Sequence, residues 1–287
     1  MASQKGNLIC QAAYRYRVFG NEQFPGNPTT ITQVEHFPAA AELLEHSRSL
    51  ATEDNAYFMP VELPLRYRVE TFSHTAPIKV CGHALLATAC HLFSNTDHEV
   101  LILETPGFTH TCTRDEGKVW LGLPRYRFQE VTPLTGALLD LLNDAGLGPQ
   151  HVERVLLYPF KVFVVIVKSV TCLDDFMLEQ FKWHNMQSLE PGALIISGES
   201  EDGSYVYRYF SPWWGKPEDT ATGSAHCYLA PYWLKAGRSA RTRQISTEGA
   251  AFIDVILKLE AVWISGNVDL EAELLCGEAL STMRMDS

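Results

Sequence analysis

Residues 81–89 read Cys-Gly-His-Ala-Leu-Leu-Ala-Thr-Ala, and residues 222–225 read Thr-Gly-Ser-Ala at the head of a second apolar run. Small or apolar residues occupy almost every position of both runs, so a helix formed there has no polar face. Such a helix is stable only when other elements cover it on all sides. We therefore expect two short buried helices, one over residues 84–90 and one over residues 225–234.

Strand-like segments precede each of these helices. They are short, apolar or β-branched, and bounded by Gly, Pro and Asn, which is typical of strands and turns. The segments lie at 14–18, 29–34 and 66–72 in the first half and at 162–167, 193–198 and 205–210 in the second. The repeated scheme predicts an α+β fold with two pseudo-symmetric domains, each a sheet or barrel wrapped around a central helix.

The domain boundary is expected in the stretch Val131 to Gly136, which contains Pro, Thr and Gly. The N-terminal α+β domain then comprises residues 1–130, with the last strand, about 273–287, as a possible completion. The C-terminal α+β domain comprises residues 131–272. Additional helices are expected near 38–51, 135–145 and 173–183, where apolar residues recur at helical spacing.

The starts of the two buried helices are candidate binding sites. A helix start carries unpaired backbone N–H groups and the positive end of the helix dipole. Gly82, Gly223 and Ser224 stand at these positions, and glycine allows close approach to a ligand. We expect their N–H groups to bind a substrate carboxylate or enolate oxygen in a cleft between the domains.

Composition narrows the classes of function. The 287 residues include 23 Lys and Arg against 34 Asp and Glu, a net charge of −11. That balance argues against nucleic-acid binding, which requires a basic surface. No window approaches the ~18 consecutive apolar residues of a membrane span, and the first residues lack the apolar segment of a signal peptide. The expectation is a soluble, cytoplasmic protein without a membrane partner.

Cysteine and histidine spacing argues against a metal site. No Cys-x-x-Cys, His-x-x-x-His or His-Glu-x-x-His pattern occurs, so neither a disulfide framework nor a metal ligand set is expected. Each cysteine taken alone is expected to be a small buried apolar residue. No nucleotide-binding or nucleophile-elbow motif occurs either. The cysteines are Cys10, Cys81, Cys90, Cys112, Cys172, Cys227 and Cys276.

Three motifs resemble the phenazine-biosynthesis PhzF-like family, which shares its fold with diaminopimelate epimerase and proline racemase. The first is Val18-Phe19 followed by residues 24–28, Phe-Pro-Gly-Asn-Pro. The second is the 81–89 run. The third extends from Phe210-Ser211-Pro212-Trp213 through residues 218–226, Glu-Asp-Thr-Ala-Thr-Gly-Ser-Ala-His.

The resemblance implies two pseudo-symmetric domains with the active site between them, a homodimer, and neither a metal nor an organic cofactor. His83 and Asp219 match a His and an Asp of the family's site, and Asn27 of the first motif is a candidate for substrate binding. The related racemases place a Cys at each helix start. Here only Cys81 is present, because Thr222 occupies the second position, so a two-thiol racemase is not expected.

One departure concerns the proton carrier. Family members that isomerise 2,3-dihydro-3-hydroxyanthranilate use a Glu in a Ser-Glu-Thr-x-Phe motif, whereas residues 54–58 here read Asp-Asn-Ala-Tyr-Phe. Aligned on the aromatic residue, Asn55 takes the position of the Glu. An amide can hold an oxygen by hydrogen bonds but cannot take a proton from carbon at neutral pH. A shift by one or two residues places Asp54 or Glu53 there instead.

These observations predict a cofactor-independent isomerase or cyclase that acts on a small carbonyl- or carboxylate-bearing metabolite, in the biosynthesis of a secondary metabolite. In this hypothesis His83 and Asp219 transfer or orient protons, and Asn55 binds substrate. Two alternatives stay open. One is a conventional proton-shuttling isomerase that uses Glu53 or Asp54. The other is a member of the family that binds a ligand or a protein without catalysis.

Overall fold

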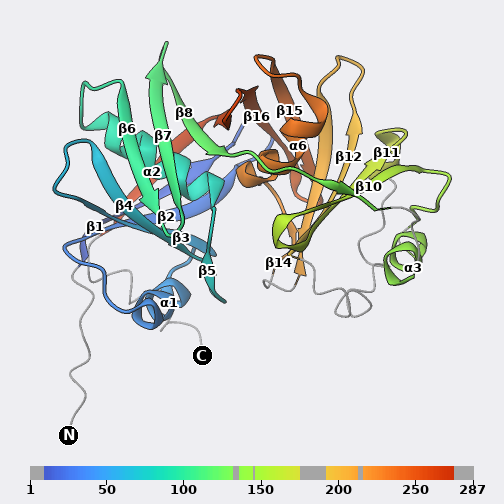
Figure 1. Cartoon of the computed structure of the whole chain (residues 1–287). Helices are drawn as coiled ribbons and strands as arrows, with labels where there is room; N and C mark the ends of the chain where they lie inside the picture. Colours follow the sequence, from blue (N-terminus) through green and yellow to red (C-terminus); the bar gives the residue numbers. More distant parts are fainter. Residues whose placement is uncertain (1–9, 132–135, 145, 175–191, 213–215, 275–287) are drawn as a thin grey trace, which may run out of the picture. The chain divides into compact units, whose positions relative to one another are not determined.

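The computed structural model describes residues 10–131, 136–144, 146–174, 192–212 and 216–274 (Figure 1). The chain divides into two compact units, which are described separately. Unit 1 comprises Met1–Leu123 and Ser265–Ser287, and unit 2 comprises Pro124–Ile264. The division falls before residue 131, because β9 (Gln129–Glu130) pairs with the first long strand of unit 2. Residues 275–287 of the expected closing strand lie outside the described residues.

Unit 1 is built on a mixed sheet with the strand order β18, β1, β2, β3, β4, β6, β7, β8. The β2–β3 and β4–β6 pairs are parallel and the others are antiparallel, while the short β5 pairs with the far end of β4. The strands are β1 (Cys10–Val18), β2 (Asn27–Val34), β3 (Asp54–Pro60), β4 (Arg66–Phe72), β5 (Pro77–Ile78), β6 (Val100–Thr105), β7 (Phe108–Asp115), β8 (Lys118–Pro124) and β18 (Val268–Leu274).

Helix α2 (Gly82–Ser94) is the centre of unit 1. It packs against β1, β2, β3, β6 and β18, and Figure 1 shows it enclosed by the strands of this unit. Eleven of its residues are buried, which accounts for the absence of a polar face in its sequence. Burial of apolar surface on all sides of the helix is the main stabilising contribution here. Helix α1 (Ala40–Ser49) buries only Leu43 and Ser47 and packs against β4.

Unit 2 repeats this arrangement. Its sheet has the order β9, β10, β11, β12, β13, β15, β16, with β11–β12 and β13–β15 parallel and β14 paired to the far end of β13. The elements are β10 (Val152–Tyr158), β11 (Val162–Val167), β12 (Ala193–Glu199), β13 (Tyr205–Ser211), β14 (Lys216–Asp219), β15 (Ser239–Ser246), β16 (Gly249–Leu257), β17 (Ala261–Ser265), the helices α3 (Ala137–Asp144), α4 (Thr171–Asp174) and α6 (His226–Trp233), and the 3₁₀ turns η1 (Pro159–Lys161) and η5 (Gly223–Ala225).

The two units therefore share one alternation of strand directions. From β1 to β7 the pairs run antiparallel, parallel, antiparallel, parallel, antiparallel, and from β10 to β16 they run in the same sequence. Each buried helix lies in the crossover between the last two parallel strands. The α+β fold with a sheet around a central helix, predicted from the sequence, is confirmed.

Two further predictions have structural outcomes. The described cysteines with free thiols are Cys81, Cys90, Cys112, Cys172 and Cys227, and all of them except Cys90 are buried. Within the described part of the chain, no helix has the length and apolar character needed to cross a membrane.

Candidate active site

The start of α2 places His83 in the interior of unit 1. Cys81 is the residue before the helix, with φ −107° and ψ 95°, and its own side chain makes no capping hydrogen bond. His83 is one residue into the helix and its side chain is only 4 % exposed. Gly82, between the two, is buried as well.

Asp54 comes to the same place from β3. It is the first residue of that strand, and its backbone is paired with Thr29 of β2. The Thr29 hydroxyl also donates a hydrogen bond of 2.8 Å to the Asp54 carbonyl oxygen. These contacts fix the backbone position from which the carboxylate projects. The Asp54 side chain is 15 % exposed, so solvent reaches it to a small extent.

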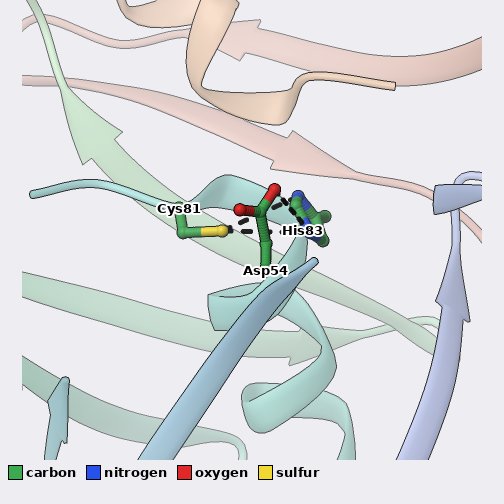
Figure 2. Close-up of side chains that lie close together, drawn as sticks. All are labelled: Asp54, Cys81 and His83. Carbon is green, nitrogen blue, oxygen red and sulfur yellow. Dashed lines mark hydrogen bonds and ion pairs between the residues drawn. The ribbon is translucent and has the colours of Figure 1, made fainter. Parts of the chain in front are cut away.

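Asp54, Cys81 and His83 form a compact cluster (Figure 2). His83 Nε2 lies 3.8 Å from Asp54 Oδ2, and Cys81 Sγ lies 3.7 Å from His83 Nδ1 and 3.9 Å from Nε2. A carboxylate can accept a proton, and an imidazole, whose ordinary pKa lies near neutrality, can accept or donate one. The cluster thus has the composition of an acid–base site.

Asn55 points away from this cluster. Successive side chains of a strand face opposite sides of the sheet, so Asp54 and Asn55 cannot serve the same site. The Asn55 amide donates hydrogen bonds of 2.8 Å to Ser47 Oγ and 2.8 Å to the Thr52 carbonyl, and its oxygen accepts one from the Thr52 hydroxyl. Asn55 is fully buried and ties the loop before β3 to the end of α1.

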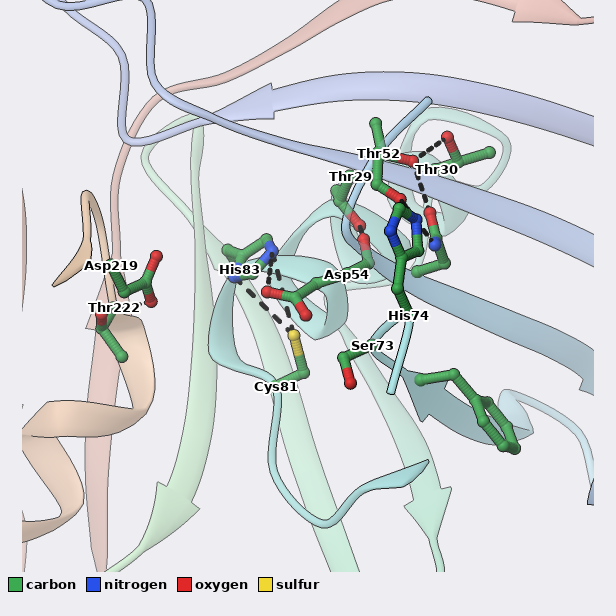
Figure 3. Close-up of polar contacts among 12 residues, drawn as sticks. Thr29, Thr30, Thr52, Asp54, Ser73, His74, Cys81, His83, Asp219 and Thr222 are labelled. Carbon is green, nitrogen blue, oxygen red and sulfur yellow. Dashed lines mark hydrogen bonds and ion pairs between the residues drawn. The ribbon is translucent and has the colours of Figure 1, made fainter. Parts of the chain in front are cut away.

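The Thr52 contacts continue this internal network (Figure 3). Its hydroxyl is 2.6 Å from the Thr30 hydroxyl, and its carbonyl is 3.0 Å from His74 Nε2. Glu53, the other carboxylate considered from the sequence, has an exposed side chain. Among residues 53–55, the one whose side chain lies beside His83 is therefore Asp54.

Asp219 is the last residue of β14 in unit 2, four residues before Gly223, where η5 starts. Its carboxylate accepts a hydrogen bond from the Thr222 hydroxyl, as Figure 3 shows. Gln244 of β15 clamps the turn, since its side chain binds both the Asp219 carbonyl and the Thr222 N–H. Asp219 is 6 % exposed and therefore well shielded from solvent. Gly223 is buried beside it, and Ser224 is half-buried.

Asn27 is the first residue of β2 and is almost completely buried. Gly26 precedes it with φ +88°, and a Cβ on Gly26 would stand 2.8 Å from both Val18 O and Gly20 N. The turn therefore requires glycine for conformation and for space. This requirement explains the Gly-Asn-Pro motif as a turn that starts β2; the part predicted for Asn27 in substrate binding stays a prediction.

A buried polar network supports the helix start of unit 2. His226, at the beginning of α6, contacts the Tyr205 hydroxyl through Nδ1 at 2.7 Å and the Tyr207 hydroxyl through Nε2 at 3.3 Å. The Tyr207 hydroxyl in turn donates to the Thr222 carbonyl at 3.2 Å. Burial lowers the pKa of His226 to about 3 and raises the pKa values of both tyrosines. The network is neutral at pH 7.

An ion pair anchors the other side of the Asp219 turn. Arg208 Nε donates to Glu218 Oε1 at 2.6 Å, and the two side chains are only 6 % and 4 % exposed. Arg208 also donates to the Leu173 carbonyl, and Glu218 Oε2 accepts from the Thr247 N–H. Every charged end is thus hydrogen-bonded, as a buried ion pair requires.

The sequence predicted that His83 and the Cys-Gly-His helix start belong to the site. For the strand residue that faces them it favoured Asn55, with Asp54 or Glu53 as the alternative. The signal that favours Asp54 is the pairing of β3 with β2 and β4, which sets the face of each side chain. That pairing is a long-range property. It is not visible in the local pattern of residues 53–58.

The chain has clear relatives. A family model described as phenazine biosynthesis-like protein matches residues 16–262. An uncharacterized isomerase of Pseudomonas aeruginosa is 28 % identical over 88 % of this chain and 94 % of its own length. An uncharacterized isomerase of Vibrio cholerae is 25 % identical over 83 % of this chain and 81 % of its own. The mouse phenazine biosynthesis-like domain-containing protein 1 is 26 % identical over 86 % and 90 %.

Solved structures share the fold. A phenazine biosynthesis protein of Enterococcus faecalis, of the PhzF family, superposes with a TM-score of 0.75 at 23 % identity, covering 92 % of this chain and 98 % of its own. A probable proline racemase of Agrobacterium radiobacter superposes with a TM-score of 0.62 at 14 % identity, covering 92 % of each chain.

Proposed function

We propose a proton-transferring isomerase for this chain, which belongs to the phenazine biosynthesis-like family. Several bacterial relatives carry isomerase names, and they support an isomerase-type enzyme. The proposal is that Asp54 is the group that carries the proton, with His83 as its partner. The substrate class is a small metabolite that bears a carbonyl or carboxylate group next to the carbon that loses its proton.

The observation that carries the proposal is the 3.8 Å approach of Asp54 Oδ2 to His83 Nε2 at the start of α2. Removal of a proton from carbon leaves negative charge on an adjacent oxygen. A helix start stabilises such a charge through its dipole and its N–H groups, including that of Gly82. Asp54 takes the proton and returns it to another carbon of the same molecule. His83 holds the carboxylate in place and offers a donor to the substrate.

Asn55 has no part in this proposal, because its amide is engaged with Ser47 and Thr52. Asp219 is assigned to substrate binding, on the resemblance of its motif and on its position shortly before the second buried helix. The buried Thr222 hydroxyl donates to one oxygen of Asp219 and so orients the carboxylate. Gly223, Ser224 and Asn27 are assigned to substrate binding with it.

Further features belong to the same proposal and await their own measurements. They are a homodimeric state, catalysis without metal or organic cofactor, location in the cytoplasm, and a role in the biosynthesis of a secondary metabolite. Ring closure by positioning alone, which was part of the leading hypothesis from the sequence, is not favoured, and the proton-shuttling alternative is preferred. The Asp54 carboxylate beside His83 is the proton carrier that ring closure by positioning would not need.

The test uses purified protein and a panel of small hydroxy and unsaturated acids, with 2,3-dihydro-3-hydroxyanthranilate among them. Wild type is expected to convert a member of the panel, with slower turnover when the transferred hydrogen is deuterium. Asp54→Asn should lower kcat by about 10²- to 10⁴-fold, the usual contribution of a general base. Glu53→Gln is the matched control, since it removes a neighbouring exposed carboxylate.

Two results decide the matter. Full activity of Asp54→Asn together with no effect of substrate deuteration would contradict the proposal and return the cyclase hypothesis. Tight binding of a panel member without any turnover by wild type would favour the alternative of a non-catalytic binding protein.

A further inference from the structure

We propose that Asp54, Cys81 and His83 form a binding site for a thiophilic divalent cation, with Zn²⁺ as the best match, and that the bound cation inhibits the enzyme. Cation binding stands on the cluster geometry alone. The inhibition rests on the proposed function of Asp54 and His83.

The chemistry of the three donors selects the cation. A thiolate, an imidazole nitrogen and a carboxylate oxygen are the three ligand types that Zn²⁺ takes in proteins, and three protein ligands leave a fourth position for water. Mg²⁺ and Ca²⁺ prefer oxygen ligands only. The sulfur of Cys81 therefore favours Zn²⁺, Co²⁺ or Cd²⁺ over the cations that are abundant in cells.

The distances are close to those of a bound cation. Tetrahedral coordination at ordinary zinc bond lengths separates nitrogen from oxygen by about 3.4 Å and nitrogen from sulfur by about 3.6 Å. In the structure the separations from His83 Nε2 are 3.8 Å to Asp54 Oδ2 and 3.9 Å to Cys81 Sγ. All three ligand atoms lie within 4.8 Å of one another. The two separations that involve His83 Nε2 need to contract by only a few tenths of an ångström to reach these values.

Position and charge assist binding. Cys81 and His83 flank Gly82 at the start of α2, while Asp54 enters from β3, so a rigid helix and a paired strand hold the three donors. A thiolate at a helix start is stabilised by the dipole. With Asp54 ionised, the thiolate and the carboxylate together balance the charge of the cation. The Cys81 thiol releases its proton when the cation binds.

A second Cys–His pair provides an internal comparison. Cys172 Sγ lies 3.4 Å from His151 Nδ1 in unit 2, a closer approach than in the cluster. Yet in the described part of the chain the 54, 81 and 83 positions form the sole group of three donors close enough for one ion. If two donors are enough to hold the cation, Cys172 and His151 should bind it as well. If three donors are needed, only the cluster of Asp54, Cys81 and His83 should bind it.

Inhibition follows from the atoms that the cation occupies. A bound Zn²⁺ takes the lone pair of His83 Nε2 and an oxygen of Asp54, the two groups assigned to proton transfer. The bound oxygen of Asp54 can then no longer accept a proton from carbon, and His83 Nε2 can no longer hold the carboxylate or donate to the substrate. The inhibition should be reversed by a chelator, because no covalent bond of the protein changes.

The experiment is a titration of untagged, reduced protein with Co²⁺, followed by competition with Zn²⁺. Wild type should bind one Co²⁺ with a sulfur-to-cobalt charge-transfer band in the near ultraviolet. Cys81→Ser should lose that band, and Asp54→Asn should weaken binding at least about tenfold, since loss even of outer contacts to a metal ligand costs 10- to 100-fold. Cys172→Ser is the matched control and should bind as wild type does.

The outcomes separate the two proposals. No band with wild type, or the same band with Cys81→Ser, would overturn the cation site. Stoichiometric binding without loss of turnover would overturn the inhibition. Absence of turnover in metal-free and metal-loaded protein alike, with the band intact, would reject the proposed isomerase and keep the cation site.

Discussion

The two units have the same order of strand directions and the same backbone at the helix start, but they carry their carboxylates at different positions. Cys81 and Thr222 precede the buried helices with nearly identical dihedral angles, −107° and 95° against −110° and 93°. The strand pairings of the two units define equivalent positions. Asp54 in unit 1 is equivalent to Ala193 in unit 2, and Ile78 in unit 1 is equivalent to Asp219 in unit 2. Each unit therefore has one acid where the other has an apolar residue.

The same backbone arrangement thus places a carboxylate in two different settings. In unit 1 the carboxylate comes from the start of a strand and meets a histidine of the helix. In unit 2 it comes from the turn before the helix and meets the Thr222 hydroxyl. The equivalent backbone positions hold these groups at the positive end of a helix in both units. In the proposed function the side chains, and not the backbone, make Asp54 of unit 1 the proton carrier and Asp219 of unit 2 a binding group.

The largest effect should come from exchanging the acids for amides one at a time. Asp54→Asn should reduce kcat by about 10²- to 10⁴-fold. Asp219→Asn should act mainly on KM and lower kcat/KM by about 10- to 150-fold, the value of a hydrogen bond to a charged group. Steady-state kinetics on both variants checks the division. Equal losses of kcat in the two variants would contradict the assignment of proton transfer to Asp54 and of substrate binding to Asp219.

The next effect concerns stability. Arg208→Met leaves Glu218 buried without its partner and should lower the free energy of unfolding by about 3–5 kcal/mol. Arg154, whose pair with Glu130 is nearly half exposed, is the control. Arg154→Met should cost less than about 1 kcal/mol. Denaturant titration of both variants measures the difference, and similar losses would show that burial of the pair is not what stabilises unit 2.

Asn55 can be replaced by the residue that unit 2 has at the same rung, Leu194. Asn55→Leu leaves the hydrogen-bonding groups of Ser47 and Thr52 without their buried partner and should destabilise the protein by about 1–3 kcal/mol. It should leave kcat within a few-fold of wild type. A collapse of kcat in a variant that remains folded would restore Asn55 as a residue of the site.

The last effect is a pH dependence, which is small over any single pH unit. The pKa of His226 is lowered to about 3, below the value near 6.5 of an unfolded chain. His226 therefore binds a proton less readily in the folded state than in the unfolded state. Its contribution to the free energy of unfolding is complete above pH 6.5 and declines as the pH falls toward 3. The slope from this residue is at most about 1.4 kcal/mol per pH unit.

His226→Leu, which copies Leu85 at the matching position of α2, should lower stability at pH 7 but reduce that slope. Thermal unfolding of both proteins between pH 4 and 7 measures it. An unchanged slope would mean that other groups carry the acid sensitivity.

Much of the fold could be predicted from the composition of each segment and from the spacing of its apolar residues. The small-residue runs became α2 and α6, and the apolar run 162–167 became β11 with the same bounds. The helix expected over 38–51 is α1, Ala40–Ser49. Of the helix expected near 173–183, only residues 173 and 174 lie among the described residues, where they end α4 (Thr171–Asp174). These elements are encoded locally, by the side chains of the segment itself.

The site was less accessible to such reasoning. His83 stands at a helix start and Asp219 a few residues before one, and local sequence marks both starts. The choice between Asp54 and Asn55 depends on the partners of β3, which come from residues about 25 positions before it and from the strand after it. The grouping of Cys81 with Asp54 likewise arises only when a strand and a helix meet. Spacing along the chain carries no sign of either.

The alternation of faces along β3 also has an evolutionary consequence. A point mutation at residue 54 or 55 changes one side chain, but gain or loss of a single residue between α1 and β3 would slide the strand by one rung. The carboxylate would then turn toward α1 and the amide toward His83. The length of the segment after Ser49 should therefore vary less among active relatives than its composition does.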